Sequence, residues 1–433
     1  MRHGCIIIVE GAAPLTELCG ISILERLLRS LQRCGLTEAI ILSSTPSIIK
    51  EHLAPPSWPR AELKVTIQDR PEGVLTIDQI CDIWPDGLHS LLLICGGTVF
   101  DIRLLDRLCR VSSPTVLLDS VVPAQLQTLV ESAPSIGAGK LCGAAVLRRD
   151  WATAQHGSVE EVLQYGLETN ALRTLDVARE PLYYPNQLRE LRPFWFRAPL
   201  PAQKREAEEI LLDSIQKGEL DIPAMIHAPI EKFLVSHLCK TSVTPHHLTI
   251  LWAAGAVGTT LLFAAGSLLW GVIVALLVGI VDGLDGKQAR LKVETTKQGK
   301  VEHHLDSLFA FVWPAALAYH FHTSGELPNA FGYLLLLFLG ESLDGAAQAG
   351  IRFTARKSMK DPSLFGRMIR LVGGRRNIFV WVLIATILAG APARSLIIMA
   401  YWELTTAALD FSHLAWAYYS MGKESWNQDR KHA

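Results

Sequence analysis

The sequence predicts an α/β domain followed by an all-α domain that crosses a membrane. Up to about residue 190, short apolar runs alternate with amphipathic helical patterns, the order expected of a mostly parallel sheet covered by helices. From Leu248 onward, long uncharged apolar runs dominate. All eight cysteines precede this change and none forms a C-x-x-C pair, which favours buried free thiols in a reducing compartment over a zinc site or a disulfide framework.

The first domain is expected to cover residues 1–200. Cys5–Val9, Ala39–Leu42 and Leu91–Cys95 are short apolar runs typical of buried strands. Ile23–Cys34 carries leucines at helical spacing on one face and is expected to be an amphipathic helix. The first residues lack the long apolar region of a signal peptide, so this domain is expected to fold in the cytoplasm.

A connector is expected over residues 201–240. Pro201–Gln216 has the pattern of a charged amphipathic helix. Ala224–Leu238 has apolar residues at helical spacing beside Lys232 and His237. This segment fits a helix on the membrane surface and an ordinary packed helix equally well.

The membrane domain is expected to span residues 241–420, followed by a cytoplasmic tail over 421–433. Some of its runs are shorter than the ~20 residues that a bilayer requires, so their helices should extend into the flanking residues. The loops after the second and fourth runs are rich in Lys and Arg, whereas the loops between them are not. Basic loops mark the cytoplasmic side, so both termini are expected inside, at a cytoplasmic (inner) membrane. The six runs cover residues 248–265, 268–285, 305–321, 330–350, 377–390 and 394–418.

Carboxylates follow the second apolar run. Asp282 and Asp285 share one helix face with Ala289, while Glu302 and Asp306 lie four residues apart on the next expected helix. Acidic side chains at the end of a membrane helix are costly and indicate function. Four converging carboxylates require neutralisation by cations, and oxygen ligands suit Mg²⁺ or Mn²⁺.

Two such ions can clamp a diphosphate and stabilise its leaving group. Lys287 and Arg290 would add positive charge for phosphate oxygens. The net charge of −1 gives no support to a nucleic-acid partner.

These residues resemble the signature of the CDP-alcohol phosphotransferases, D-x2-D-G-x2-A-R-x8-G-x3-D-x3-D. The first half matches at Asp282, Asp285, Gly286, Ala289, Arg290 and Gly299. In the second half, a one-residue deletion aligns Glu302 and Asp306 with the last two aspartates, whereas an ungapped alignment would place His303 and Ser307 there. The resemblance covers about residues 222–420, including Thr244–Thr249, which is similar to the start of the family's first membrane helix.

The resemblance implies a membrane enzyme that moves a phospho-alcohol from a CDP-alcohol to a second alcohol and releases CMP. It implies that two divalent ions are held by Asp282, Asp285, Glu302 and Asp306, with Asp306 also the base. It implies that the CDP-alcohol contacts Asp282, Gly286, Ala289, Arg290 and Gly299. The acceptor would be a lipid or a polyol phosphate, and a homodimer is common in the family.

Several polar residues near this site have two readings. Arg375 and Arg376 fit equally a helix anchor and a ligand for the acceptor phosphate. Glu341 and Asp344 fit a cavity or a packing role, and His303 and His304 are polar filler or metal ligands. As alternatives to an enzyme, the same carboxylates would serve an ion-coupled transporter or a non-catalytic membrane scaffold.

The first domain resembles the sugar-phosphate nucleotidyltransferases through Gly20–Arg26 and Leu91–Asp101. The residues that would carry out this chemistry are replaced. Glu10–Pro14 replaces the glycine-rich nucleotide loop, Gly96 or Gly97 stands in place of the metal aspartate, and Phe194–Arg197 lies near the place of a second aspartate. This half is therefore interpreted as a degenerate domain without nucleotidyltransferase activity. The order of the two domains resembles the bifunctional inositol-phosphate cytidylyltransferase and di-inositol-phosphate phosphate synthase, which points to an inositol-type or polyol-phosphate substrate.

Overall fold

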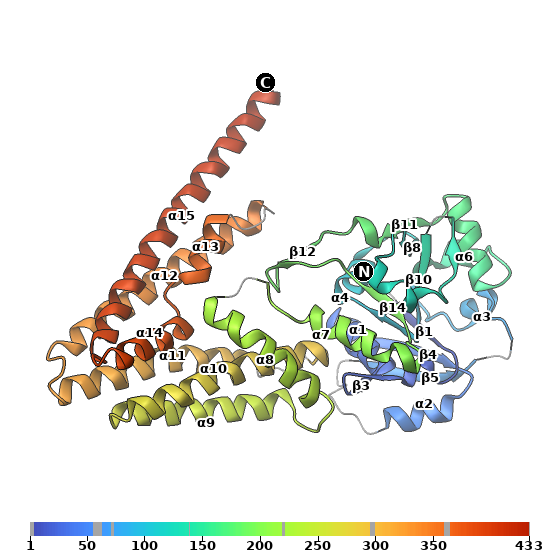
Figure 1. Cartoon of the computed structure of the whole chain (residues 1–433). Helices are drawn as coiled ribbons and strands as arrows, with labels where there is room; N and C mark the ends of the chain where they lie inside the picture. Colours follow the sequence, from blue (N-terminus) through green and yellow to red (C-terminus); the bar gives the residue numbers. More distant parts are fainter. Residues whose placement is uncertain are drawn as a thin grey trace. The chain divides into compact units, whose positions relative to one another are not determined.

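The computed structural model describes the chain in two compact units (Figure 1). The described residues are 4–54, 63–70, 73–137, 139–218, 221–294, 299–358 and 364–432; side chains are not described at 299–307, 352, 354–358, 364 and 420–432. The first unit comprises residues 1–184, 190–215 and 289–295, and the second comprises 185–189, 216–288 and 296–433.

An eight-stranded sheet forms the centre of the first unit. Its strand order is β11-β8-β10-β6-β1-β4-β5, with β9 paired to β10. The neighbours β6-β1-β4-β5 are parallel, whereas β10 is antiparallel to β6, β8 and β9. The prediction of a mostly parallel α/β sheet is confirmed. The strands are β1 (Gly4–Val9), β4 (Glu38–Ser43), β5 (Lys64–Asp69), β6 (Ser90–Cys95), β8 (Thr115–Asp119), β9 (Ser135–Ile136), β10 (Gly139–Arg148) and β11 (Arg173–Asp176).

Helices and short strand pairs surround this sheet. The predicted helix is present as α1, where the Ser22 side chain caps the N-terminus by accepting from the Glu25 N–H. Leucines on the inner face of α1 are buried. The other helices are α2 (Pro46–Leu53), α3 (Ile77–Asp82), α4 (Ile102–Arg110), α5 (Arg149–Ala152), α6 (Val159–Glu168) and α7 (Lys204–Ser214), with α1 covering Ile23–Arg33; β2 (Glu17–Leu18) pairs with β3 (Ile21–Ser22), β7 (Thr98–Phe100) with β14 (Trp195–Arg197), and β12 (Tyr183–Tyr184) with β13 (Arg189–Glu190).

The first unit is completed by a segment from far along the chain. On α1, Arg26 donates to the carbonyl of Leu291, and Arg29 Nη1 donates to the carbonyl of Lys292 at 2.7 Å. Arg29 also lies 3.5 Å from Glu294. Both arginines are buried, so the carbonyl groups compensate part of the cost of removing the guanidinium groups from water.

The eight cysteines are free. Cys5, Cys19, Cys142 and Cys239 are buried, and the others are partly buried. Burial raises the pKa of the Cys5 thiol to about 12, so this thiol stays protonated and unreactive at neutral pH.

The second unit is helical, and Figure 1 traces its helices from green to red. Its core contains Trp252, Trp313, Phe321 and Phe379, all nearly inaccessible to solvent. A capping box between Thr244 and His247 starts α9. The helices are α8 (Ile222–Leu238), α9 (Pro245–Ala264), α10 (Leu268–Leu291), α11 (Gly299–Thr323), α12 (Ala330–Ser358), α13 (Leu364–Val372), α14 (Arg376–Leu388) and α15 (Arg394–His432).

A helix occupies each of the six predicted spans. Within the described residues, α9, α10 and the Ala330–Ile351 part of α12 are long and apolar enough to cross a membrane. Phe365–Val372 and Arg376–Leu388, bent by 47°, form a further broken span when taken together. Three or four crossings are therefore supported by length and composition, and the count of six remains a prediction.

Candidate functional site

The first half of the signature lies on one continuous helix. Residues 268–291 contain no proline, and the signature positions continue the helix that starts in the apolar run. Asp282 and Asp285 are each half-buried on α10. Their spacing of three places them on one face, as the sequence predicts.

Asp282 is paired with the first residue of α14. Arg376 Nη2 lies 2.6 Å from Asp282 Oδ2. The Asp282 side chain keeps 37% of its exposure, against 17% for Arg376, so the carboxylate is still accessible to a ligand. The Arg376 guanidinium also lies over the Phe309 ring, 5.6 Å from its centroid. The structure thus brings a residue expected at the acceptor phosphate directly to a predicted metal ligand.

Asp285 is held from α9 and from its own helix. Thr249 Oγ1 donates to Asp285 Oδ2 at 3.2 Å, and the Gly286 N–H donates to Oδ1. Thr249 is buried and also donates to the Pro245 carbonyl. The sequence analysis included Thr249 only as part of the segment that starts a membrane helix. Its contact with Asp285 could not be predicted from that position.

A buried ion pair lies beside the two aspartates and was missed at the sequence level. Lys287 Nζ lies 2.6 Å from Glu231 Oε2 on α8, and the two side chains are 7% and 9% exposed. Lys287 was expected to face phosphate oxygens, but here its ammonium is directed to Glu231. Glu231 stands in a segment interpreted from its apolar spacing alone, so no motif marked it.

The remaining signature residues of α10 belong to the first unit. Arg290 Nε donates to the Ile215 carbonyl at 3.2 Å, and Ala289 is half-buried. Gly299, Glu302 and Asp306 lie in the first turns of α11, but their side chains, and those of His303 and His304, fall outside the described ones. Their expected convergence with Asp282 and Asp285 therefore stays a prediction.

The donor chemistry of the described part suits a hard divalent ion. Asp282 and Asp285 offer only carboxylate oxygens, and their neighbour Thr249 offers a hydroxyl, a set that Mg²⁺ and Mn²⁺ prefer. Among the described residues, no group of three or more His, Cys, Asp or Glu side chains is arranged to hold a metal ion. A complete site would need the α11 carboxylates.

Arg375 differs from its neighbour Arg376. It precedes the first residue of α14 in extended conformation and interacts electrostatically with Asp221, Asp344 and Asp410. Asp344 Oδ2 accepts from Gln348 Nε2 at 2.7 Å, and the same amide lies 3.4 Å from Asp410 Oδ2. Asp344 thus takes part in a polar contact between α12 and α15.

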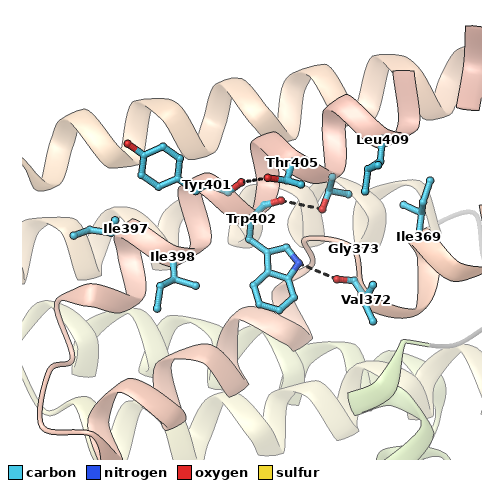
Figure 2. Close-up of a pocket in the computed structure, with 10 residues that line it drawn as sticks. Ile369, Val372, Gly373, Ile397, Ile398, Tyr401, Trp402, Thr405 and Leu409 are labelled. Carbon is cyan, nitrogen blue, oxygen red and sulfur yellow. Dashed lines mark hydrogen bonds between the residues drawn. The ribbon is translucent and has the colours of Figure 1, made fainter. Parts of the chain in front are cut away.

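A cavity in the second unit is apolar and contains no signature residue. It measures about 550 Å³ and is lined by α13, α15 and the glycine that follows α13. Figure 2 shows Trp402 pointing from α15 toward Val372, whose carbonyl accepts from Trp402 Nε1 at 2.8 Å. This cavity offers apolar surface and no charged group.

The two glycines that stand where the resemblance implies an aspartate differ in the space available for a side chain. A Cβ atom at Gly96 would lie 2.8 Å from Val9 Cγ2 and 3.1 Å from the Ile8 carbonyl oxygen. Gly97 is roomier, with its nearest neighbour at 3.8 Å. Trp195–Arg197 forms a strand beside Thr98–Phe100, so the two eroded segments lie side by side.

Comparisons with known proteins separate the two halves. For the N-terminal half, similar solved structures include HddC from Yersinia pseudotuberculosis, at 13% identity and a TM-score of 0.36, covering 48% of this chain and 99% of that one. The inositol-1-phosphate CTP transferase of T. maritima is similar at 10% identity and a TM-score of 0.35, covering 48% and 96%.

The membrane half has a closer relative. The family profile described as CDP-alcohol phosphatidyltransferase matches residues 242–408. The inner membrane protein YnjF of Escherichia coli (strain K12) is 30% identical over 154 residues, which are 34% of this chain and 72% of that protein. The long apolar helices and the similarity to an inner membrane protein show that the chain is a membrane protein. With the aspartate pair of α10 inside the matched region, the chain belongs to the CDP-alcohol phosphatidyltransferase family.

Proposed function

We propose that this chain is an integral-membrane phosphotransferase that moves a phospho-alcohol from a CDP-alcohol to an alcohol acceptor. The observation that carries the proposal is the half-buried aspartate pair of α10, with Arg376 at Asp282 and Thr249 at Asp285. The acceptor is a lipid or a polyol phosphate. Both termini lie on the cytoplasmic side of an inner membrane crossed by six helices.

In the proposed reaction, the acceptor hydroxyl oxygen forms a bond to the phosphorus that carries the donor alcohol. The bond from this phosphorus to the oxygen of CMP breaks, and CMP leaves. Asp306 accepts the proton of the acceptor hydroxyl. Two Mg²⁺ or Mn²⁺ ions held by Asp282, Asp285, Glu302 and Asp306 would supply charge stabilisation for the diphosphate.

The other residues orient the donor. Gly286, Ala289 and Gly299 leave room for it beside the aspartates, and Arg290 contributes positive charge for its phosphate oxygens. Arg376 reaches Asp282 from α14, and Arg375 and Arg376 bind the acceptor phosphate. We assign residues 1–200 to a domain without nucleotidyltransferase activity that supports folding, dimerisation or regulation, 201–240 to a connector, 241–420 to the catalytic domain and 421–433 to a tail.

The test is CMP release by the purified whole chain in detergent. CDP-alcohols with lipid and polyol head groups are combined with lipid and polyol-phosphate acceptors, with Mg²⁺, with Mn²⁺ and with a chelator. We expect CMP from at least one pair, only when a divalent ion is present. Release that continues in the chelator would contradict the metal assignment. A folded protein that yields no CMP from any pair would favour a scaffold or an ion-coupled transporter.

A further inference from the structure

Helix α8 buries two polar side chains and exposes several apolar ones. His227 and Glu231, four residues apart, are 6% and 7% exposed. Ile226, Ile230 and Phe233 are 51%, 43% and 63% exposed. Exposed apolar side chains of this kind suit contact with lipid. The buried polar side chains of α8 are the ones that can contact other helices of the second unit.

The buried face of α8 lies against glycines of the signature helix. The His227 ring lies next to Gly279, 3.4 Å from the position of a Cβ atom there, and the Glu231 carboxyl group occupies the space that a Cβ atom at Gly283 would need. Gly283 stands between Asp282 and Asp285 in the sequence. The missing side chain is therefore what admits a third carboxylate beside the aspartate pair.

Lys287 neutralises that carboxylate. It follows Gly283 by one helical turn, and the 2.6 Å pair that it forms with Glu231 is almost completely buried. Lys287 carries its charge on a flexible four-carbon stem, and its ammonium meets the carboxylate that fills the space at Gly283, the neighbour of Asp282 in the sequence. Its ammonium would compete with a divalent ion wherever it met Asp282 or Asp285.

We propose that Glu231 is a positioning residue for the aspartate pair, acting by holding Lys287 away from Asp282 and Asp285. This inference rests on the proposed function, because it concerns divalent-ion binding at that same site. Glu231 and Lys287 together carry no net charge, so the pair leaves the net charge beside Asp282 and Asp285 unchanged. Neither position belongs to the fixed residues of the signature.

The charges give the two single variants opposite effects. Glu231→Gln keeps the size of the side chain and releases the Lys287 ammonium, so the affinity for Mn²⁺ should fall by about 10- to 100-fold, the usual range when a partner outside the direct ligands is lost. Lys287→Met leaves the Glu231 carboxylate unpaired, so the affinity should stay equal or rise. The double variant should return to within about threefold of the unmodified protein, as expected for coupled neighbours.

The measurement is Mn²⁺ titration of the whole chain in detergent, followed by the electron paramagnetic resonance signal of free Mn²⁺. Glu326→Gln and Lys240→Met make the same charge changes at exposed positions of the second unit and should leave the affinity unchanged. Glu231→Asp keeps the charge on a shorter stem and should give a smaller loss, which provides a second variant if Glu231→Gln does not fold.

A role confined to packing would weaken Mn²⁺ binding in both single variants and more in the double variant, which would overturn the proposal. An unchanged affinity in Glu231→Gln would also overturn it. In the CMP assay, Glu231→Gln should raise the Mg²⁺ concentration for half-maximal rate while the rate at saturating Mg²⁺ recovers. Opposite Mn²⁺ shifts without any CMP release would reject the proposed reaction alone, and CMP release without these shifts would reject the role of Glu231 alone.

Discussion

Two arginine-paired aspartates, one in each unit, differ in their accessibility. In the first unit, Asp119 is 1% exposed and accepts from Arg192 Nη2 at 2.5 Å and Trp195 Nε1 at 3.0 Å. In the second unit, Asp282 has its arginine but keeps 37% of its side-chain exposure. A carboxylate that is closed and fully partnered supports the fold, whereas one that stays accessible can also meet a ligand. Asp119 is therefore committed to its own contacts, whereas Asp282 keeps surface that a ligand can reach.

The largest expected effect comes from the proposed base. Asp306→Asn preserves the side-chain size but removes the proton acceptor, so the initial rate of CMP release should fall by about 10²- to 10⁴-fold. The matched control is Asp106→Asn in the first unit, where Asp106 pairs with Arg110 on an exposed helix face. The control should release CMP at the unmodified rate. An Asp306→Asn protein as fast as its control would remove Asp306 from the mechanism.

A smaller effect is expected on the stability of the first unit, when Gly96 or Gly97 is replaced by aspartate. Gly96→Asp places a Cβ atom 2.8 Å from Val9 and close to the Ile8 carbonyl, and such overpacking should lower the free energy of unfolding by about 1–3 kcal/mol. Gly97→Asp meets nothing nearer than 3.8 Å and should cost less. Chemical denaturation measures both. Equal losses at the two positions would show that side-chain space does not decide which glycine accepts an aspartate.

The smallest effect concerns pH and the first unit. Burial raises the pKa of Asp176, but hydrogen bonds from the Ser120 hydroxyl and from the Ser120 and Ala178 amides outweigh it, so the pKa lies below the usual range. A depressed carboxyl pKa contributes stability above the unfolded value near ~4, and this stability is lost as pH falls through the folded value.

Ser120→Ala should therefore lower the free energy of unfolding at neutral pH by about 0.5–1.5 kcal/mol. The difference from the unmodified protein should shrink as the pH falls below about 4. Denaturation curves between neutral and acidic pH measure it. A difference that does not change with pH would mean that the hydroxyl does not influence the titration of Asp176.

The sequence predicted what depends on local pattern and missed what depends on close approach between helices. Periodicity placed the strand at Cys5–Val9 and the signature helix, because each is specified within its own segment. It did not reveal that β10 runs antiparallel to its neighbours. The sequence also left α8 undecided between the membrane surface and ordinary packing. The structure combines features of both, because His227 and Glu231 are buried whereas apolar side chains of the same helix are exposed.

The buried pair of Glu231 and Lys287 could not have been read from spacing. The two residues lie on separate helices, and their contact requires the space left by Gly283, which the sequence shows only as one more glycine in a membrane helix. Arg376 is different, since it was a candidate for a phosphate and the structure adds its contact with Asp282. The side chains of Glu302 and Asp306 lie outside the described ones, so the second half of the site rests on the signature.

The segment that completes the first unit has a consequence for biosynthesis. Leu291, the last residue of α10, and Lys292, whose carbonyls accept from Arg26 and Arg29, are made only after all of α9 and the rest of α10 have been synthesised. Until these two apolar helices have left the ribosome, the guanidinium groups of Arg26 and Arg29 lack these carbonyl acceptors. Folding of the sheet domain and insertion of the first membrane helices are then linked in time rather than consecutive.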